Sequence, residues 1–355
     1  MRRRALDLIV CPVCKSDFNV FVTESNGDDI VSGQLQCCGC NRTYPIRRSI
    51  PRLLPGALPL DRQRTSDAFG WEWTEFRELH ALDRYQEQFL NWISPIEPSF
   101  FAGKVVLDAG CGMGRFAVVS AKFGARDVIA LDLSDAVEVA AENARPFPNV
   151  HVIQGDIFNL PLRSRTSADH LSTRAVVDFA YSIGVLHHLP DPRAGFLAIA
   201  EHLKANGNLF AWVYGRENNG WIVRIVNPIR QVVSSRLPRR TLYCGALLIA
   251  ALLQATLRVI YRPTARVSWL QIVHNVLPYR AYLDWLSGFG FRHNHHVVFD
   301  HLVAPTAFYI TRAEFETWFG DAGLTNVKIS WRNENSWRGL GEVPTRAASR
   351  VPGDS

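Results

Sequence analysis

Four cysteines near the start of the chain have the spacing of a metal site. Two residues separate Cys11 from Cys14, and two separate Cys37 from Cys40. A tight turn of this length presents two thiolates to one tetrahedral ion. Four thiolates leave no open coordination position, so the pattern predicts a structural Zn²⁺ site rather than a catalytic one. Cys38 could replace a neighbour, but only Cys37 and Cys40 preserve the spacing of the pairs.

A glycine-rich segment further along the chain is suited to binding a nucleotide-like ligand. An apolar run enters Asp108-Ala109-Gly110-Cys111-Gly112-Met113-Gly114, and a helical stretch follows. Glycines at alternate positions remove the Cβ atoms that would block a ligand at the carboxyl edge of a parallel sheet. The dinucleotide fingerprint G-x-G-x-x-G fails, because Arg115 stands at its last position. Asp132 ends the next apolar run, where a carboxylate can accept hydrogen bonds from both ribose hydroxyls.

These segments resemble the class I S-adenosylmethionine (SAM)-dependent methyltransferases, whose first motif has the form D-x-G-x-G-x-G. The resemblance covers 104–214 and includes Gln154–Ile157, Asp178–Pro192 and Leu203–Leu209. It implies that SAM is the cofactor. It also implies that the acidic residue after the third strand, Asp156, and its neighbour contact the adenine. The residues that it places at the cofactor are Asp108, Gly110, Gly112, Gly114, Asp132, Leu133, Asp156, Ile157 and Ser182. Residues 163–177 are longer and more polar than the usual link into the fourth strand.

The surroundings of the cysteines carry a second resemblance. Residues 6–54 are similar to the small zinc-ribbon proteins that activate tRNA and release-factor methyltransferases, for example in Cys11-Pro12-Val13-Cys14 and in Thr43-Tyr44-Pro45-Ile46. In that family the ribbon stabilises a methyltransferase partner. The resemblance therefore implies a ribbon fused to its methyltransferase, and it carries over no substrate.

Candidate catalytic residues follow the fourth predicted strand. Methyl transfer from a sulfonium needs alignment more than acid–base chemistry, so a general base is optional. His187 and His188 stand close to where the methyl group is expected, and His187 is the candidate base. The alternative is that one histidine shapes the pocket while the other packs or caps a helix. Tyr181-Ser182-Ile183-Gly184 replaces the Asn/Asp-Pro-Pro-Tyr/Phe signature of many N-methyltransferases, which favours transfer to oxygen or carbon.

Other aromatic and histidine residues allow two interpretations. Trp71 and Trp73 could close over the methionine end of SAM, although core packing is the more common role of such residues. Asp300-His301 could supply a substrate-site histidine, but a loop histidine with local hydrogen bonds is favoured. His295-His296 resembles a metal-binding tract only superficially, since no further ligands stand at suitable spacing.

The elements that must position these residues follow from the hydrophobic pattern. Short apolar runs alternate with helical stretches between 104 and 214, which predicts βαβ units and a parallel sheet. A capping box at Thr311-x-x-Glu314 predicts a helix to about Ala322, with strands after it. The predicted fold is α/β: a Rossmann-like, doubly wound, seven-stranded sheet with an N-terminal zinc ribbon and a helical insertion. The predicted domains are a zinc ribbon (1–60), a helical linker or lid (61–103), the SAM-binding core (104–214), the helical substrate-side insertion (215–305), a C-terminal helix and strands completing the sheet (306–342), and a flexible tail (343–355).

Composition excludes few partners. The 355 residues are 47% hydrophobic with a net charge of +6, as in an ordinary globular protein, and this charge identifies no partner by itself. The apolar stretch Leu8–Val10 is too short for the core of a secretory signal. The chain is therefore expected to be cytoplasmic.

The insertion has an unusual charge pattern. Between Asn218 and Leu283 there is no acidic residue and no lysine, but there are nine arginines, which suit bidentate contact with phosphate or carboxylate. The apolar run Leu242–Leu253 is shorter than the about 20 residues of a transmembrane helix and suits a buried or interfacial helix. One interpretation is a lid that packs on the core. The other is a segment that docks peripherally on an anionic membrane or holds an amphiphilic, phosphate-bearing acceptor.

The expected function is SAM-dependent methylation, at oxygen or carbon, of a small or lipid-linked molecule that is anionic. An RNA methyltransferase that uses the ribbon to hold nucleic acid is one alternative. A non-catalytic SAM-binding scaffold is another.

Overall fold

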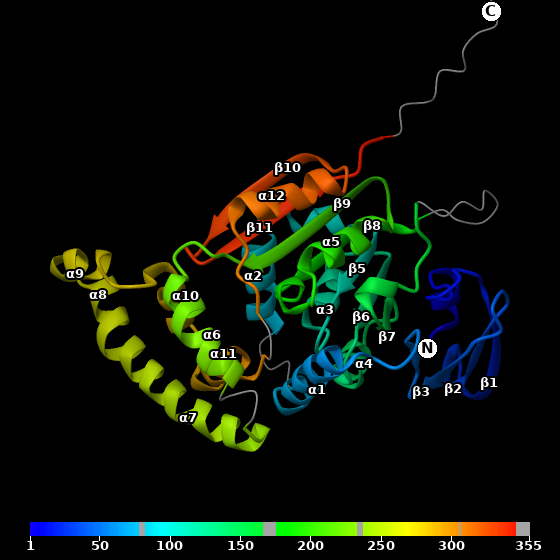
Figure 1. The fold of residues 1–355 in the computed structure, drawn as a ribbon, viewed down its shortest axis with the longest axis horizontal. Helices are drawn as coiled ribbons and strands as arrows, with labels where there is room; N and C mark the ends of the chain where they lie inside the picture. Colours follow the sequence, from blue (N-terminus) through cyan, green and yellow to red (C-terminus); the bar gives the residue numbers. More distant parts are fainter. Residues whose placement is uncertain (78–81, 166–174, 233–236, 305–306, 346–355) are drawn as a thin grey trace, which may run out of the picture.

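A seven-stranded sheet forms the centre of the protein in a computed structural model that describes residues 1–77, 82–165, 175–232, 237–304 and 307–345 (Figure 1). The order of these strands is β7-β6-β5-β8-β9-β11-β10. The first five strands run parallel, and β11 and β10 are antiparallel. The strands are β5 (Val105–Ala109), β6 (Asp127–Asp132), β7 (Val150–Gly155), β8 (Val177–Ile183), β9 (Leu203–Tyr214), β10 (Thr325–Arg332) and β11 (Ser336–Glu342).

Helices cover both faces of this sheet, which confirms the doubly wound fold. One face packs against α2 (Leu82–Ile93), α3 (Arg115–Lys122) and α4 (Ala136–Ala144), and the other against α5 (Pro192–Ala200) and α12 (Arg312–Asp321). Buried on both sides, the parallel strands are nearly continuous apolar runs. The capping box is present, because the Thr311 hydroxyl accepts a hydrogen bond from the Glu314 amide. Short helical turns connect the elements: η2 (Pro98–Phe101), η3 (Ile157–Asn159) and η4 (Leu186–His188).

The N-terminal ribbon continues the central sheet. After the turn η1 (Arg3–Asp7) it contains β1 (Phe18–Asn26), β2 (Asp29–Cys37), β3 (Thr43–Arg47) and β4 (Ile50–Leu53). Strand β4 pairs in parallel with β7, through Arg52 with Gln154 and Leu53 with Gly155, so the sheet has 11 strands. The sequence did not predict this junction. It covers the edge of β7, which would otherwise present unpaired backbone groups.

The ribbon and the core also share side-chain contacts. Its apolar residues belong to the same buried cluster as one face of the central sheet, and Ile9 bridges to Leu162. Arg4 lies 3.0 Å from Asp127, and the Lys15 ammonium donates a hydrogen bond to the Leu160 carbonyl. The ribbon is therefore packed on the core rather than tethered to it.

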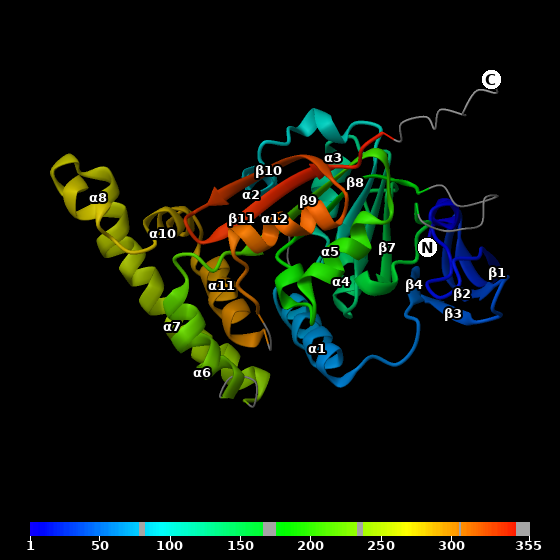
Figure 2. The ribbon, with the colours of Figure 1, turned by 45° about the horizontal axis from the view of Figure 1, so that its top comes forward.

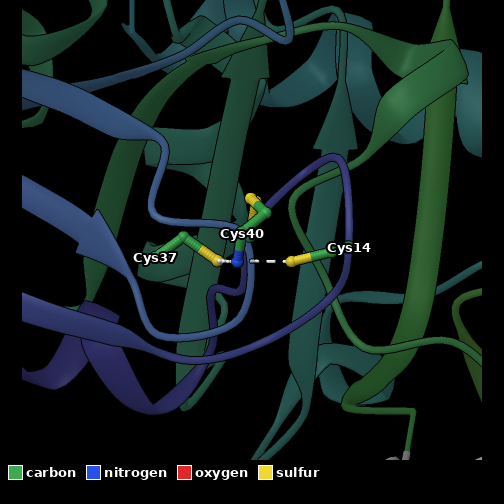
Figure 3. A group of neighbouring side chains, drawn as sticks. Cys14, Cys37 and Cys40 are labelled. Carbon is green, nitrogen blue, oxygen red and sulfur yellow. Dashed lines mark hydrogen bonds between the residues drawn. The ribbon is translucent and has the colours of Figure 1, made fainter.

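The four predicted zinc ligands come together in the ribbon, and Figure 3 shows three of them, Cys14, Cys37 and Cys40. Their sulfur atoms all lie within 4.8 Å of one another, with Cys11 3.7 Å from Cys40 and Cys14 3.2 Å from Cys37. A separation of this size suits four thiolates around one Zn²⁺. The Cys38 side chain does not belong to the group and is exposed.

The insertion is helical and lies at the opposite end of the molecule from the ribbon (Figures 1 and 2). Its long helix is composed of α7 (Arg239–Thr256), η7 (Leu257–Tyr261) and α8 (Arg262–Arg266), without interruption. Its inner face packs on α11 through residues such as Ala246, Ala250 and Phe299. The other elements are η5 (Ile222–Val226), α6 (Asn227–Val232), η8 (Ser268–Leu270), α9 (Gln271–Asn275), α10 (Arg280–Ser287) and α11 (Phe291–Val303). Between the ribbon and the core, α1 (Leu60–Glu75) packs against α4 and α11.

Two sequence-based expectations need correction. The apolar run Leu242–Leu253, which is short for a transmembrane helix, lies within a longer helix from Arg239 to Arg266, in which Gln254 accepts a hydrogen bond from Asn294. Residue Val343 does not begin a flexible tail, since it is 3% exposed and its amide donates to the Gly207 carbonyl. Most of the predicted tail (346–355), the middle of the polar link (166–174), Arg236 and residues 305–306 lie outside the described residues.

We predict that loss of one zinc ligand destabilises the whole protein, because the ribbon shares its core with the central sheet. Cys14→Ser and Cys40→Ser should each lose the metal and lower Tm by more than about 5 °C. Cys38 is an exposed cysteine outside the group, so Cys38→Ser is the matched control and should change neither the zinc content nor the Tm. Thermal unfolding and elemental analysis measure both effects. Purified wild-type protein without stoichiometric zinc would contradict the prediction.

Candidate active site

A cavity of about 530 Å³ lies at the carboxyl ends of the parallel strands. Its floor is formed by the loops after β5, β6, β7 and β8, the edge at which parallel α/β sheets bind ligands. Its other walls come from α1 and from the helices of the insertion. Aromatic side chains line much of it, among them Phe69, Trp73, Trp92, Trp212, Tyr214, Tyr282 and Trp285.

The glycine-rich turn after β5 forms one wall. Gly110 and Gly112 have φ of 89° and 53°, a region that favours glycine. A Cβ on Gly110 would lie 2.4 Å from Val185, and one on Gly112 would lie 2.9 Å from the Trp73 ring. Only backbone fits at these positions, so the turn can approach a ligand closely.

Asp132, at the end of β6, holds this turn in place. One carboxylate oxygen accepts the Gly112 amide at 2.8 Å, and the other accepts the amide and hydroxyl of Ser134 at 2.9 and 2.7 Å. Burial raises the pKa of Asp132, although these hydrogen bonds oppose the shift. The carboxylate lines the cavity beside the turn, and its contact with a ribose stays a prediction.

Six of the nine predicted cofactor residues line the cavity: Gly110, Gly112, Asp132, Leu133, Asp156 and Ile157. The other three lie behind its wall. Burial raises the pKa of Asp108 to about 7, and the Ser182 hydroxyl donates to the Ala109 carbonyl, which ties β8 to β5. Gly114 allows α3 to approach Ala140 of α4, where a Cβ would be 3.1 Å away. These three residues support the turn, and direct contact with SAM stays a prediction for all nine.

Helix α1 closes over the cofactor side of the cavity. Asp156 accepts a hydrogen bond from Arg62 at 2.7 Å, and the Arg62 guanidinium lies 4.3 Å from the centre of the Phe158 ring. Trp73, one turn from the end of the helix, lines the cavity, whereas Trp71 packs against Phe299 in the core. Trp71 therefore has the core role, and closure of Trp73 over the methionine end of SAM stays a prediction.

The two adjacent histidines after β8 occupy different places. His187 is fully buried, does not line the cavity, and packs at a tilt against Tyr214 with 3.9 Å between ring centres. Burial lowers its pKa well below the ordinary value, and the nearby Arg230 adds to this shift. His188 lines the cavity and packs against Phe69. The general-base role of His187 stays a prediction, and its burial behind the wall does not favour it.

Several residues that line the cavity were not predicted from the sequence to do so, or were predicted to have another role. Asp300 and His301 are on α11 and line the cavity, so the preference for a loop histidine was wrong. His296, from the same helix, and Arg230, from α6, also line it. The spacing of His293, His296 and Asp300 places them on one face of a helix, and this could have predicted that they line one site together. Nothing in the sequence indicated that α1 would bury Glu72 beside them.

Comparison with known proteins identifies the fold and family. Residues 79–329 match the family described as Methyltransferase domain, which covers more than half of the chain. The chain belongs to this methyltransferase family. Residues 2–49 match a second family, described as Trm112p-like protein, and contain the four-cysteine group. SAM is the methyl donor of these methyltransferases, and the cysteine group is a structural zinc site.

Curated relatives are ubiquinone biosynthesis O-methyltransferases. The protein from Erwinia tasmaniensis is 29% identical over 169 residues, 47% of this chain and 63% of the relative. The protein from Albidiferax ferrireducens is 30% identical over 170 residues, 47% of this chain and 61% of the relative. The match thus spans less than two thirds of each relative's length. A SAM-dependent methyltransferase from Aquifex aeolicus is a structural neighbour with 14% identity and a TM-score of 0.38, covering 74% of this chain and 98% of its own.

We predict that SAM binding depends on Asp132 and on the glycine turn. Asp132→Ala removes the expected ribose acceptor and releases the Gly112 amide, and should weaken binding by about 2–4 kcal/mol. Gly112→Val should have a similar effect, because its side chain would collide with Trp73 and disfavour the positive φ. Calorimetry with SAM measures both. Asp321→Ala, at an exposed ion pair with Arg193, is the control. Unchanged affinity in both test variants would contradict the cofactor site.

Proposed function

We propose that the protein methylates a hydroxyl oxygen of a small or lipid-linked acceptor, with SAM as donor. The supporting observation is one continuous cavity that joins the glycine turn and Asp132 to the aromatic walls of the insertion. The curated relatives, named as O-methyltransferases, favour oxygen over carbon as the acceptor atom. When bound, SAM supplies a methyl group on a sulfonium. The chain's own residues then have to align the acceptor and exclude water.

The acceptor carries an anionic group in this proposal. Arg230 is 2% exposed and lines the cavity, and its Nε has no hydrogen-bond partner among the described residues. Arg332 also lines the cavity with an unpartnered Nη2, and its guanidinium lies between Trp92 and Trp285 at 5.1 and 5.2 Å from the ring centres. Buried guanidinium groups with unpaired N–H donors are costly unless a ligand accepts from them. A carboxylate or phosphate on the acceptor would satisfy both.

The outer surface of the insertion supports peripheral contact with a membrane. Among the described residues between 221 and 276, twelve large apolar side chains are exposed, including Leu248, Leu252 and Val259 on the long helix and Trp269, Ile272 and Val276 after it. Exposed arginines accompany them, including Arg240, Arg258 and Arg266, without any acidic residue up to Leu283. An apolar surface with a basic rim is complementary to anionic lipid.

The long helix lies in the membrane surface in this proposal and does not span it. Arg239–Arg266 is long and apolar enough to cross a membrane by length and composition, and 22% of its apolar window is buried in the protein. However, α11 packs along its inner face, and His295 is 3.2 Å from the Tyr243 carbonyl. The side of the helix that contacts α11 cannot also face lipid. Ile249 and Leu253 of this helix line the cavity, so a membrane-dissolved acceptor would have a short path to the site.

We predict that methyl-labelled SAM, incubated with fractionated cell extract and the purified protein, transfers label to the lipid or small-molecule fraction. The product should contain the label as a methyl ether, because the proposed acceptor atom is a hydroxyl oxygen. Asp132→Ala should abolish the transfer, whereas Asp321→Ala should not. Label found mainly in RNA or protein, or in no fraction, would contradict the proposed function.

We predict that the protein floats with anionic liposomes and not with neutral ones. Arg239→Ala/Arg240→Ala should weaken this binding by about 2 kcal/mol, roughly thirtyfold, since each basic residue near the surface contributes about 1 kcal/mol. Arg47→Ala/Arg48→Ala, an equal change of charge on exposed residues of the ribbon, is the matched control. Equal binding to anionic and neutral liposomes, or an equal loss of binding in both double variants, would contradict membrane docking and leave the insertion with only the role of a lid.

A further inference from the structure

Glu72 is a buried carboxylic acid without an evident structural role. It lies on α1, is 0% exposed, and neither side-chain oxygen has a hydrogen-bond partner among the described residues. Burial raises its pKa well above the ordinary value, and Asp300 adds to the shift while Arg115 opposes it. A carboxyl group in this state is destabilising for the fold. Such groups gather at functional sites, which makes the neighbourhood of Glu72 a candidate.

His296 stands opposite this acid. Its Nε2 lies 2.9 Å from Glu72 Oε1, although the two groups are not aligned for a hydrogen bond. The imidazole lines the cavity and packs edge-on against Trp73, with 4.9 Å between ring centres. Trp73 in turn touches the glycine turn at Gly112. The pair therefore joins α1 to α11 directly over the cofactor side of the cavity.

The environment keeps this histidine neutral. Burial is the main reason that the pKa of His296 is lowered to about 4; Asp300 opposes this shift, and Arg115 and His295 add to it. Arg115 is enclosed by aromatic rings, with Phe116 at 4.6 Å and Trp73 at 5.2 Å from its guanidinium. The titratable and charged groups that face the pair from neighbouring elements are Arg115 of α3 and His293, His295 and Asp300 of α11.

We propose that His296 is the general base for the acceptor hydroxyl and that Glu72 is its positioning residue. This assignment rests on the proposed O-methylation. Glu72 accepts a hydrogen bond from Nε2–H once the pair closes, which fixes the tautomer with a free lone pair on Nδ1. Nε2 faces Glu72 and has no aligned hydrogen bond among the described residues, so Nδ1 is the ring nitrogen left for a ligand.

The proton balance of the step is simple. The acceptor O–H bond breaks, the proton forms an N–H bond at Nδ1, and the oxygen keeps the electron pair with which it bonds the methyl carbon. The electron pair of the broken carbon–sulfur bond stays on the donor's sulfur. The imidazolium lies beside Glu72, donates its Nε2–H to that carboxyl group, and later returns the proton to water.

A second pair in the same chain provides a matched control. His274 Nε2 lies 3.0 Å from Asp284 Oδ2, and His274 does not line the cavity. The pair resembles the Glu72–His296 pair in chemistry and differs in position. His274→Gln therefore tests whether loss of any buried histidine–carboxylate pair gives the same result.

The test uses 4-nitrocatechol, whose absorption moves to longer wavelength when a hydroxyl ionises, bound to the full chain with S-adenosylhomocysteine. In wild type and His274→Gln the bound probe should ionise at lower pH than free probe, with an ionisation constant raised about tenfold or more. In His296→Gln the constant should return towards that of free probe. In Glu72→Gln the ionisation constant of the bound probe should return part of the way to that of free probe. In Glu72→Asp some of the wild-type shift should be kept. Affinity for S-adenosylhomocysteine, measured by calorimetry, should stay within about twofold in every variant.

Four outcomes would overturn the assignment. An unshifted bound probe in the wild-type protein is the first, and a wild-type shift in His296→Gln is the second. Loss of S-adenosylhomocysteine affinity in Glu72→Gln is the third, because it would make Glu72 a ligand of the cofactor's amino group. Failure of 4-nitrocatechol to bind the wild-type protein is the fourth, and it would contradict both the hydroxylated acceptor and the assignment of His296 as its base. A normal shift without methyl transfer to any acceptor would instead contradict the proposed function and leave the ionisation at His296 standing.

Discussion

Parallel pairing of β7, β6, β5 and β8 is the constraint on which the site depends. Because these strands run in the same direction, their carboxyl ends meet at one edge, and the loops that follow them must gather there. The glycine turn and Asp132 come from neighbouring strands, and the hydrogen bond between the Asp132 carboxylate and the Gly112 amide joins their loops. The cavity, its cofactor residues and the arrangement of the covering helices all follow from this edge.

What covers the edge is specific to this chain. Helix α1 approaches from the ribbon side and the insertion from the other, and they meet at the Glu72–His296 pair. Their contact encloses several charged groups, including Arg115 and Arg230, in an aromatic cavity. Burying such groups costs folding free energy, so the enclosure is consistent with selection for binding and chemistry rather than for stability. The same insertion presents its opposite, apolar surface to the surroundings.

The ribbon solves a different structural problem. The edge strand β7 is completed by β4, and the shared core makes the zinc site part of the stability of the whole protein. Arg52 of β4 contacts both Gln154 of β7 and Glu138 of α4, so the ribbon also fixes helices next to the cofactor loops. A ribbon in this position influences the active site through packing, and its metal lies outside the cavity.

Local sequence determined the parts of this protein in which short-range chemistry decides. The spacing of Cys11, Cys14, Cys37 and Cys40 predicted the metal group, and the glycine turn with Asp132 predicted residues that line the cavity, because turns and strand ends are fixed by neighbouring residues. Only the tertiary structure placed β4 beside β7, extended the helix to Arg266, and buried Glu72 against His296. These contacts join residues far apart in the chain, and they depend on how whole elements pack, which no local pattern records.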